Sequence, residues 1–168
     1  MFKPGDIVVY GTTGVCRVDE IGPANYAGAP ADLLYYALTP LIHGGVIYTP
    51  TNTQVSMRAA ISPVEAKEVL QVLPTLSPEN LTPYNVRELG ERYAAIIAEG
   101  ELPGYAKLAM SIHHRKVCPE GQRCRYGRVD VKYIKLAEEL LCGELSVVLE
   151  REFEEVLSEF RAIAFSDR

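Results

Sequence analysis

The sequence predicts an α+β protein in which a small five-stranded β-barrel precedes an all-α bundle of about five helices. Three observations predict this order. Short β-branched runs alternate with glycine-rich turns up to residue 60, a helix start signal stands at residue 62, and helical apolar spacing continues to residue 164. Because runs of strands followed by runs of helices favour two modules, we expect one domain at 1–60 and another at 61–168.

The N-terminal third of the chain has the pattern of short strands joined by turns. Lys3-Pro4-Gly5-Asp6 is a turn cluster before the first strand, and Gly11-Thr12-Thr13-Gly14 is a second turn after it. The predicted strands cover residues 7–10, a segment from 15 onward, 33–38, 46–49 and a short closing strand near 55–59. Five short strands with such turns fit a Tudor-like or SH3-like barrel, a fold that usually binds other macromolecules.

Helical signals begin abruptly after residue 60. Ser62 can cap a helix, Pro63 fits its first turn, and Glu65 completes a capping box. The predicted helices cover residues 63–74, 85–99, 103–116, 129–142 and 146–164, with Gly143 as the break before the last one. Val64, Val86 and Val131 belong to the apolar sets of these helices.

The composition is that of an ordinary globular protein. The chain has 168 residues, 48% of them hydrophobic, and a net charge of −5. It shows no apolar signal core at the N-terminus and no apolar run long enough to span a bilayer, so we expect a cytoplasmic chain without a membrane partner. The acidic average argues against bulk nucleic-acid binding, but it does not exclude a local basic patch.

The sequence contains no phosphate loop, no nucleophile elbow and no zinc-protease motif, so we expect no catalysis and no cofactor. His113 and His114 are adjacent on a predicted helix and point about 100° apart, which prevents them from chelating one ion. Cys118 and Cys124 are separated by five residues, whereas zinc ligands more often have two to four between them. We therefore expect no metal; a loop with free thiols, a reversible disulfide and a metal site remain the three alternatives.

A basic cluster between residues 115 and 135 is the clearest functional feature of the helical half. Its members are Arg115, Lys116, Arg123, Arg125, Arg128, Lys132 and Lys135. Two helix ends and their connecting loop would present these cations together, as contacts with the phosphates of a duplex require. The alternative is that the cations pair with the acidic final helix.

Several segments also match a known family. The N-terminal segment contains Phe2-Lys3-Pro4-Gly5-Asp6-Ile7-Val8-Val9-Tyr10, Gly14-Val15, Val18, Ile21, Tyr35-Tyr36-Ala37-Leu38, Pro50, Asn52, Arg58, Ile61-Ser62 and Glu65. The C-terminal segment contains Arg87, Tyr93, Gly100, Ala137-Glu138-Glu139-Leu140-Leu141 and Glu144-Leu145. In these segments the chain resembles the CarD/CdnL family of bacterial transcription regulators, whose RNA polymerase-binding module also occurs in transcription-repair coupling factors.

The resemblance implies a non-enzymatic regulator with two partners. Its barrel would bind the RNA polymerase β subunit, and its helical domain would contact the backbone and minor groove of upstream promoter DNA and stabilise the open complex. On this basis we expect polymerase contacts at Tyr10, Arg17, Tyr36, Tyr48 and Arg58. We expect DNA contacts at Tyr84 and Arg87 together with the seven cations of the basic cluster.

The chain departs from the family in three places. It has no Trp, and Tyr84 or Val86 stands where the family places a tryptophan wedge. Ala24 and Tyr48 lie near places where the family carries arginines, and the loop with two cysteines at 117–127 also looks like a departure from the family. Two alternatives to the transcription regulator therefore stay open: an adaptor that binds proteins but not DNA, and a thiol or metal sensor that uses Cys118 and Cys124.

Overall fold

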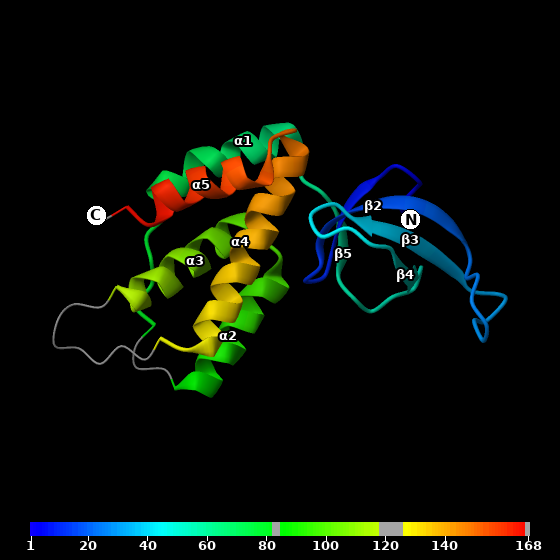
Figure 1. The fold of residues 1–168 in the computed structure, drawn as a ribbon, viewed down its shortest axis with the longest axis horizontal. Helices are drawn as coiled ribbons and strands as arrows, with labels where there is room; N and C mark the ends of the chain where they lie inside the picture. The colour runs from blue at the N-terminus through cyan, green and yellow to red at the C-terminus, as the bar shows by residue number, and fades with distance from the viewer. Residues whose placement is uncertain (82–84, 118–125, 167–168) are drawn as a thin grey trace. The chain divides into compact units, whose positions relative to one another are not determined.

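The computed structural model describes residues 1–81, 85–117 and 126–166. The chain divides into two compact units, Met1–Ile61 and Ser62–Arg168, which we call the sheet unit and the helical unit. The sheet unit holds the described strands and the helical unit holds the described helices (Figure 1). A five-stranded antiparallel sheet followed by five α-helices confirms the predicted α+β fold class.

The sheet unit is built on one antiparallel sheet with the strand order β4-β3-β2-β1-β5. The strands are β1 (Ile7–Tyr10), β2 (Gly14–Pro23), β3 (Leu34–Pro40), β4 (Ile47–Pro50) and β5 (Met57–Ala59). Alternate residues face one side of this sheet and form its buried core, which consists of Val8, Cys16, Val18, Tyr36 and Leu38. The strands form because β-branched and aromatic side chains pack well on such a half-buried pleated surface.

A hydrogen bond across the sheet shows how strongly the sheet curls. The Tyr10 hydroxyl at the end of β1 donates to Thr49 Oγ1 in β4 over 3.0 Å. Two strands separate β1 from β4, so a flat sheet would hold them about 14 Å apart at roughly 4.8 Å per strand. The sheet therefore curls toward closure through side chains, and β4 and β5 are its edge strands in the described pairing.

An irregularity in β2 changes which side chains reach the outer face. The pairing register between β2 and β3 shifts between Val18 and Glu20. A bulge of this kind bends its strand and adds one unpaired residue, and β2 and β3 do curve together (Figure 1). As a result Asp19 and Glu20 are both exposed, and Ile21 returns to the core side.

The helical unit begins where the capping signal predicts. Its elements are α1 (Pro63–Val72), the 3-10 turn η1 (Leu73–Thr75), α2 (Val86–Glu99), α3 (Leu102–Lys116), α4 (Arg128–Val148) and α5 (Phe153–Ala164). The predicted capping box is confirmed, because the Glu65 N–H donates to Ser62 Oγ and the Ser62 N–H donates to the Glu65 carboxylate. A second capping box starts α2, with Asn85 accepting from the Glu88 N–H.

The predicted helix break at Gly143 is wrong. α4 continues through Gly143 and ends at Val148. One glycine inside a helix costs about 1 kcal/mol. On either side of it Leu141 and Leu145 are fully buried, and the burial of two leucine side chains outweighs that cost.

The break lies further along the chain, at a residue that is not glycine. Glu150 has a φ of 52°, in the left-handed region. Its N–H donates to the Val147 carbonyl, and the Arg151 N–H donates to the Ser146 carbonyl. These are the two bonds of a Schellman C-cap, so the last helix begins at Phe153 and not at residue 146.

α4 is the central helix of the unit and packs against α1, α2, α3 and α5 (Figure 1). Its neighbours contribute the large buried side chains Leu89, Tyr93, Leu108, Ile112 and Phe160. Val64, Val86 and Val131, which the helical spacing assigned to apolar faces, are instead exposed. Each lies in the first turn of its helix, where none of the described helices covers it.

Candidate functional site

Of the five residues expected to contact polymerase, Tyr36 is buried in the core of the sheet unit and Tyr10 is half-buried. Tyr36 is only 3% exposed and packs in the core. Its hydroxyl accepts a hydrogen bond from the Phe2 N–H over 3.2 Å, and the two rings meet edge to face. Tyr10 is half-buried and is held by Thr49. The Tyr36 side chain therefore supports the N-terminal segment from within and offers no surface to a partner.

Arg17 lies on the outer face of β2, where its charge is already paired. Its Nε donates to Asp19 Oδ1 over 2.7 Å, and the Thr39 hydroxyl donates to the other oxygen of the same carboxylate. The bond from Thr39 and the bond from Arg17 together lower the pKa of Asp19. The three side chains form a neutral polar group on this face.

Tyr48 and Arg58 lie on the two edge strands. Tyr48 in β4 is 61% exposed, which makes it the most exposed of the five expected contacts. Arg58 in β5 is half-buried, and its Nη1 donates to the Ala59 carbonyl over 3.1 Å. An edge strand has backbone groups on one side that no other strand pairs, so β4 with Tyr48 is open to an incoming chain.

A buried ionic network joins three helices at one end of the helical unit. Asp130 Oδ1 accepts from the Tyr93 hydroxyl over 2.8 Å and from Arg115 Nε over 3.2 Å, and Oδ2 accepts from the Gly127 N–H over 2.9 Å. Burial, followed by the bond to Asp130, raises the pKa of Tyr93, so this hydroxyl stays protonated as a donor. Arg115 is only 7% exposed. The basic cluster predicts it at the DNA surface, but the structure places it in the interior because its charge is neutralised by Asp130.

Three cations of the predicted cluster stay exposed around this network, and we call Lys116, Arg128 and Lys132 the basic triad. Lys116 follows Arg115 at the end of α3, and its Nζ lies 5.8 Å from the centre of the Tyr126 ring. Arg128 and Lys132 are one turn apart on α4, and Lys132 Nζ lies 5.2 Å from the centre of the Tyr133 ring. Among the described residues no carboxylate forms an ion pair with any of the three.

Two further expected DNA contacts are exposed but lie beside acids. Arg87 Nε donates to Glu91 Oε1 over 3.0 Å, one turn along α2. Lys135 Nζ lies 3.9 Å from Glu139 Oε1, one turn along α4. Partial neutralisation makes both weaker attractors of a polyanion than the basic triad is.

The alternative pairing of the cluster with the acidic final helix is not found for the basic triad within the described residues. The α5 acids Glu155 and Glu159 both accept from Arg151, which precedes the helix. Arg161 of α5 donates from Nε and Nη2 to the two oxygens of Glu138, over 2.9 and 2.8 Å. The Arg161–Glu138 pair holds α5 against α4 without using the basic triad.

The remaining predicted site residues lie outside the described residues: Tyr84, Cys118, Arg123, Cys124 and Arg125. Cys16 and Cys142 are buried, and burial raises the pKa of the Cys16 thiol to about 11 and that of Cys142 to about 12. Both are therefore unreactive apolar core residues. Within residues 1–81, 85–117 and 126–166, no group of His, Cys, Asp and Glu side chains is arranged to hold a metal ion.

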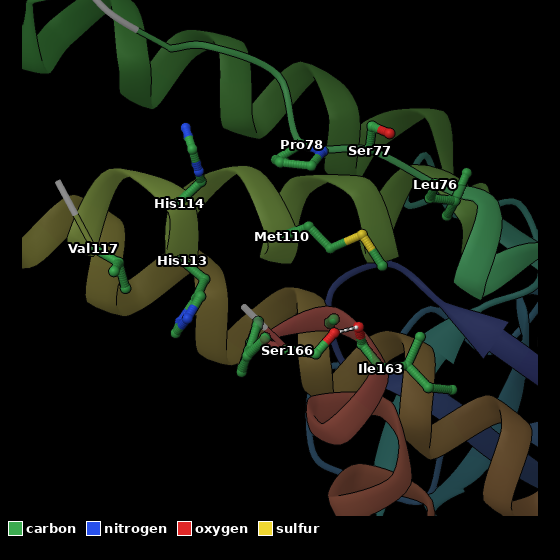
Figure 2. Close-up of a pocket in the computed structure, with 11 residues that line it drawn as sticks. Leu76, Ser77, Pro78, Met110, His113, His114, Val117, Ile163 and Ser166 are labelled. Carbon is green, nitrogen blue, oxygen red and sulfur yellow. Dashed lines mark hydrogen bonds between the residues drawn. The ribbon is translucent and has the colours of Figure 1, made fainter. Parts of the chain in front are cut away.

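A pocket of about 350 Å³ lies between the end of α3, the segment after η1 and the C-terminal end of α5. Figure 2 shows His113 and His114 projecting from α3 in different directions, as their adjacency predicts. The His113 ring stacks on Phe165 with a centroid distance of 4.0 Å. This stack joins the residue that follows α5 to the last turn of α3, and Met110 and Ile163 line the pocket beside it.

Sequence reasoning did not single out a shallow recess on the outer face of the sheet. It is lined by Glu20, Gly22, Pro23, Asn25, Tyr35, Ala37 and Tyr48. Glu20 faces outward only because of the bulge in β2. Strand alternation alone would place residue 20 on the core side, so the sequence carries no simple signal for this recess.

The sheet unit has an open edge strand and an exposed tyrosine. The helical unit has exposed cations without a described acidic partner. Both features are typical of a protein that binds other macromolecules. Residues 2–61 match the family model for the CarD-like/TRCF RID domain. The sheet unit therefore belongs to the CarD-like/TRCF RID family, and the chain is an RNA polymerase-interacting, transcription-related protein. The RID domain is an interaction domain for the RNA polymerase β subunit.

The match ends at residue 61 and does not extend into the helical unit. No curated protein sequence gives a significant match to the chain. None of the described helices is both long enough and apolar enough to cross a bilayer.

Proposed function

We propose that this protein is a non-enzymatic transcription regulator that links RNA polymerase to promoter DNA. Its sheet unit docks on the β subunit, and its helical unit lies on upstream promoter DNA and stabilises the open promoter complex. The observation that carries the DNA role is the basic triad, whose exposed charges no described carboxylate offsets.

The arrangement of the triad suits the phosphate backbone of a duplex. Arg128 and Lys132 are one turn apart on the same face of α4, and the ring of Tyr126 brings Lys116 to the start of that helix. The first turn of α4 adds the positive end of its helix dipole. Asp130 does not cancel this field, because it is buried and already neutralised by Arg115. Contacts of this kind position a protein on DNA without reading sequence.

The same end of the unit also offers apolar contact. Val86 opens α2 and Val131 lies in the first turn of α4, and both are exposed. Gly90 of α2 lies 3.9 Å from Val129 of α4, measured from an added Cβ, so the beginnings of the two helices are neighbours. Exposed apolar side chains beside cations fit contact with a minor groove, where apolar residues enter between base steps.

On the sheet unit, we place the polymerase contact at β4 and the outer face beside it. β4 is an open edge, and Tyr48 projects from it. Aromatic side chains that are exposed before binding contribute strongly to protein interfaces. Arg17 is paired with Asp19, so it offers hydrogen-bond donors to a partner but little net charge.

The test measures DNA affinity of the full chain as a function of salt concentration. The variant Lys116→Ala/Arg128→Ala/Lys132→Ala should weaken binding and lower the slope of log K against log salt by about 0.9 for each phosphate that it no longer neutralises. Lys67→Ala is the control for the loss of one surface charge, because Lys67 is exposed on α1, which lies away from the start of α4 (Figure 1). An unchanged slope in the triple variant would refute the assigned surface.

A second measurement joins this surface to transcription. With polymerase on promoter DNA, the wild-type chain should lengthen the lifetime of the open complex and the triple variant should not, while both bind polymerase equally. Equal lifetimes, with polymerase binding intact, would favour the alternative of a protein adaptor without a DNA role.

A further inference from the structure

The recess on the outer face of the sheet is organised by one row of cross-strand partners. Glu20 of β2 lies opposite Ala37 of β3, and Ala37 lies opposite Tyr48 of β4. The row therefore reads acid, small residue, aromatic across three adjacent strands. The alanine side chain is small, whereas those of Glu20 and Tyr48 on either side are large. The three residues therefore line a recess of about 100 Å³.

A second row closes one end of the recess. Gly22 of β2 lies opposite Tyr35 of β3, two residues along from the first row. The Glu20 carboxylate leans toward this row, since a Cβ added at Gly22 would lie 3.9 Å from Glu20 Oε1. The Tyr26 hydroxyl donates to the Tyr35 hydroxyl over 3.3 Å, and the two rings meet edge to face. Tyr35 is thereby held in place as a wall.

The charge in the recess is negative and available. Glu20 is exposed, and among the described residues it has no ion pair and no hydrogen bond from its side chain. The nearest cation along the strand, Arg17, is already paired with Asp19 over 2.7 Å. A carboxylate beside aromatic side chains is an arrangement that attracts a cation.

We propose that this recess binds the guanidinium group of an arginine side chain in the β-subunit segment on which the sheet unit docks. The proposal deepens the proposed function and rests on it for the identity of the partner. A guanidinium stacks on aromatic rings, pairs with a carboxylate through two parallel bonds and sheds water more readily than an ammonium does. The volume suffices, because about 100 Å³ is several times the space of about 10–15 Å³ that admits one water molecule, so a planar group of four heavy atoms can enter.

The first test uses a small probe and needs no polymerase. N-acetyl-arginine N-methylamide is titrated into the full chain, and the backbone amide NMR signals of Gly22, Ala37 and Tyr48 are followed. We expect saturating shifts at these residues. The citrulline analogue has the same shape without the charge, and it should bind at least fivefold more weakly. Equal shifts with both probes would overturn the proposal.

Matched variants assign the effect to the recess. Glu20→Gln should weaken arginine-probe binding at least fivefold, and the signals of the rest of the sheet should stay in place because Glu20 is exposed. Asp32→Asn removes another exposed carboxylate from the same unit and should leave binding unchanged. Loss of probe binding in both variants to the same degree would show a diffuse charge effect and would also overturn the proposal.

The second test compares binding of these full-length variants to core RNA polymerase. Glu20→Gln should weaken binding about tenfold and reduce its salt dependence, whereas Asp32→Asn should match the wild type. Wild-type polymerase affinity in Glu20→Gln would overturn the assigned partner. If the wild-type chain does not bind polymerase but binds the arginine probe through Glu20, the proposed function fails and the guanidinium site stands.

Discussion

The two units treat their surface charges in opposite ways. On the outer face of the sheet, Arg17, Asp19 and Thr39 bond to one another, and the group is close to neutral. At the end of the helical unit, the buried Arg115 is neutralised while the basic triad is left exposed without a described acidic partner. The sheet unit is therefore suited to a partner of defined shape, whereas the helical unit is suited to a charged polymer whose contact depends on salt.

Their interiors differ as well. The core cluster of the sheet unit is made of Val8, Cys16, Val18, Tyr36 and Leu38. The helical unit buries Arg115, Asp130, Glu138 and Glu144 among its apolar side chains. Buried charges are costly when one partner is lost, so the helical unit should be the more sensitive of the two to single polar substitutions.

The largest effect is expected from Asp130→Ala. It leaves the buried Arg115 without the carboxylate at 3.2 Å and removes the acceptor of the Tyr93 hydroxyl. The free energy of unfolding of the helical unit should fall by about 3–5 kcal/mol. Urea unfolding followed by amide signals from each unit measures this, with Glu91→Ala at an exposed ion pair as the control, expected within about 0.5 kcal/mol. A sheet unit that loses equal stability would break the distinction between the two units.

A smaller effect is expected from Tyr10→Phe in the sheet unit. It removes the bond that joins β1 to β4 and leaves the buried Thr49 hydroxyl without that donor. We expect a loss of about 1 kcal/mol from the sheet unit alone. Tyr48→Phe is the control, since it deletes an exposed hydroxyl from the same sheet. Equal losses in the two variants would mean that the bond across the sheet does not stabilise the curl.

Lys132 and Lys135 on α4 allow a direct comparison. Lys135 lies beside Glu139, whereas Lys132 has no described acidic partner. Lys132→Ala should lower the salt slope of DNA binding by about 0.9, the value for one phosphate contact. Lys135→Ala should lower it less, because Glu139 lies 3.9 Å from the Lys135 ammonium. The two affinities should differ by a few-fold. If Lys135→Ala changed the slope more than Lys132→Ala does, the basic triad would not be the main DNA contact.

The smallest effect concerns acid stability. The hydrogen bond from Lys107, at 2.9 Å, and then that from Arg92, at 2.7 Å, lower the pKa of Glu79 below its usual value of 4.5. A lowered carboxyl pKa stabilises the fold above the unfolded pKa, and this contribution is lost as pH falls through the folded pKa. The Glu79 side chain is 39% exposed, so the contribution should be below about 1 kcal/mol. Glu79→Gln should make the unfolding free energy of the helical unit depend less on pH below about 4.5, and it should leave that of the sheet unit unchanged.

The sequence predicts most of the architecture because its local signals are strong. Proline, glycine and capping residues mark the turns and the helix starts, and the Ser62–Glu65 capping box is found as expected. The error at Gly143 has a physical reason: a glycine predicts a stop only where burial does not outweigh its cost. The helix actually ends next to Glu150, which has a left-handed φ. A glutamate does not predict this conformation, so the sequence does not indicate the helix end.

The site is harder to predict because it depends on tertiary contacts. Spacing in the sequence groups Arg115 with Lys116 as adjacent cations, yet one is buried against Asp130 and the other is exposed. The bulge that turns Glu20 outward breaks the alternation from which its face would be inferred. Charge patterns therefore locate the surface, but only packing shows which of its charges a ligand can reach.

The Asp130 network has a mechanical consequence for the basic triad. Arg115 is the chain neighbour of Lys116, and Asp130 lies midway between Arg128 and Lys132 on the first turns of α4. One carboxylate thus anchors the backbone beneath all three cations. A ligand that binds the basic triad would therefore meet cations whose backbone is already fixed, so little backbone ordering should accompany binding.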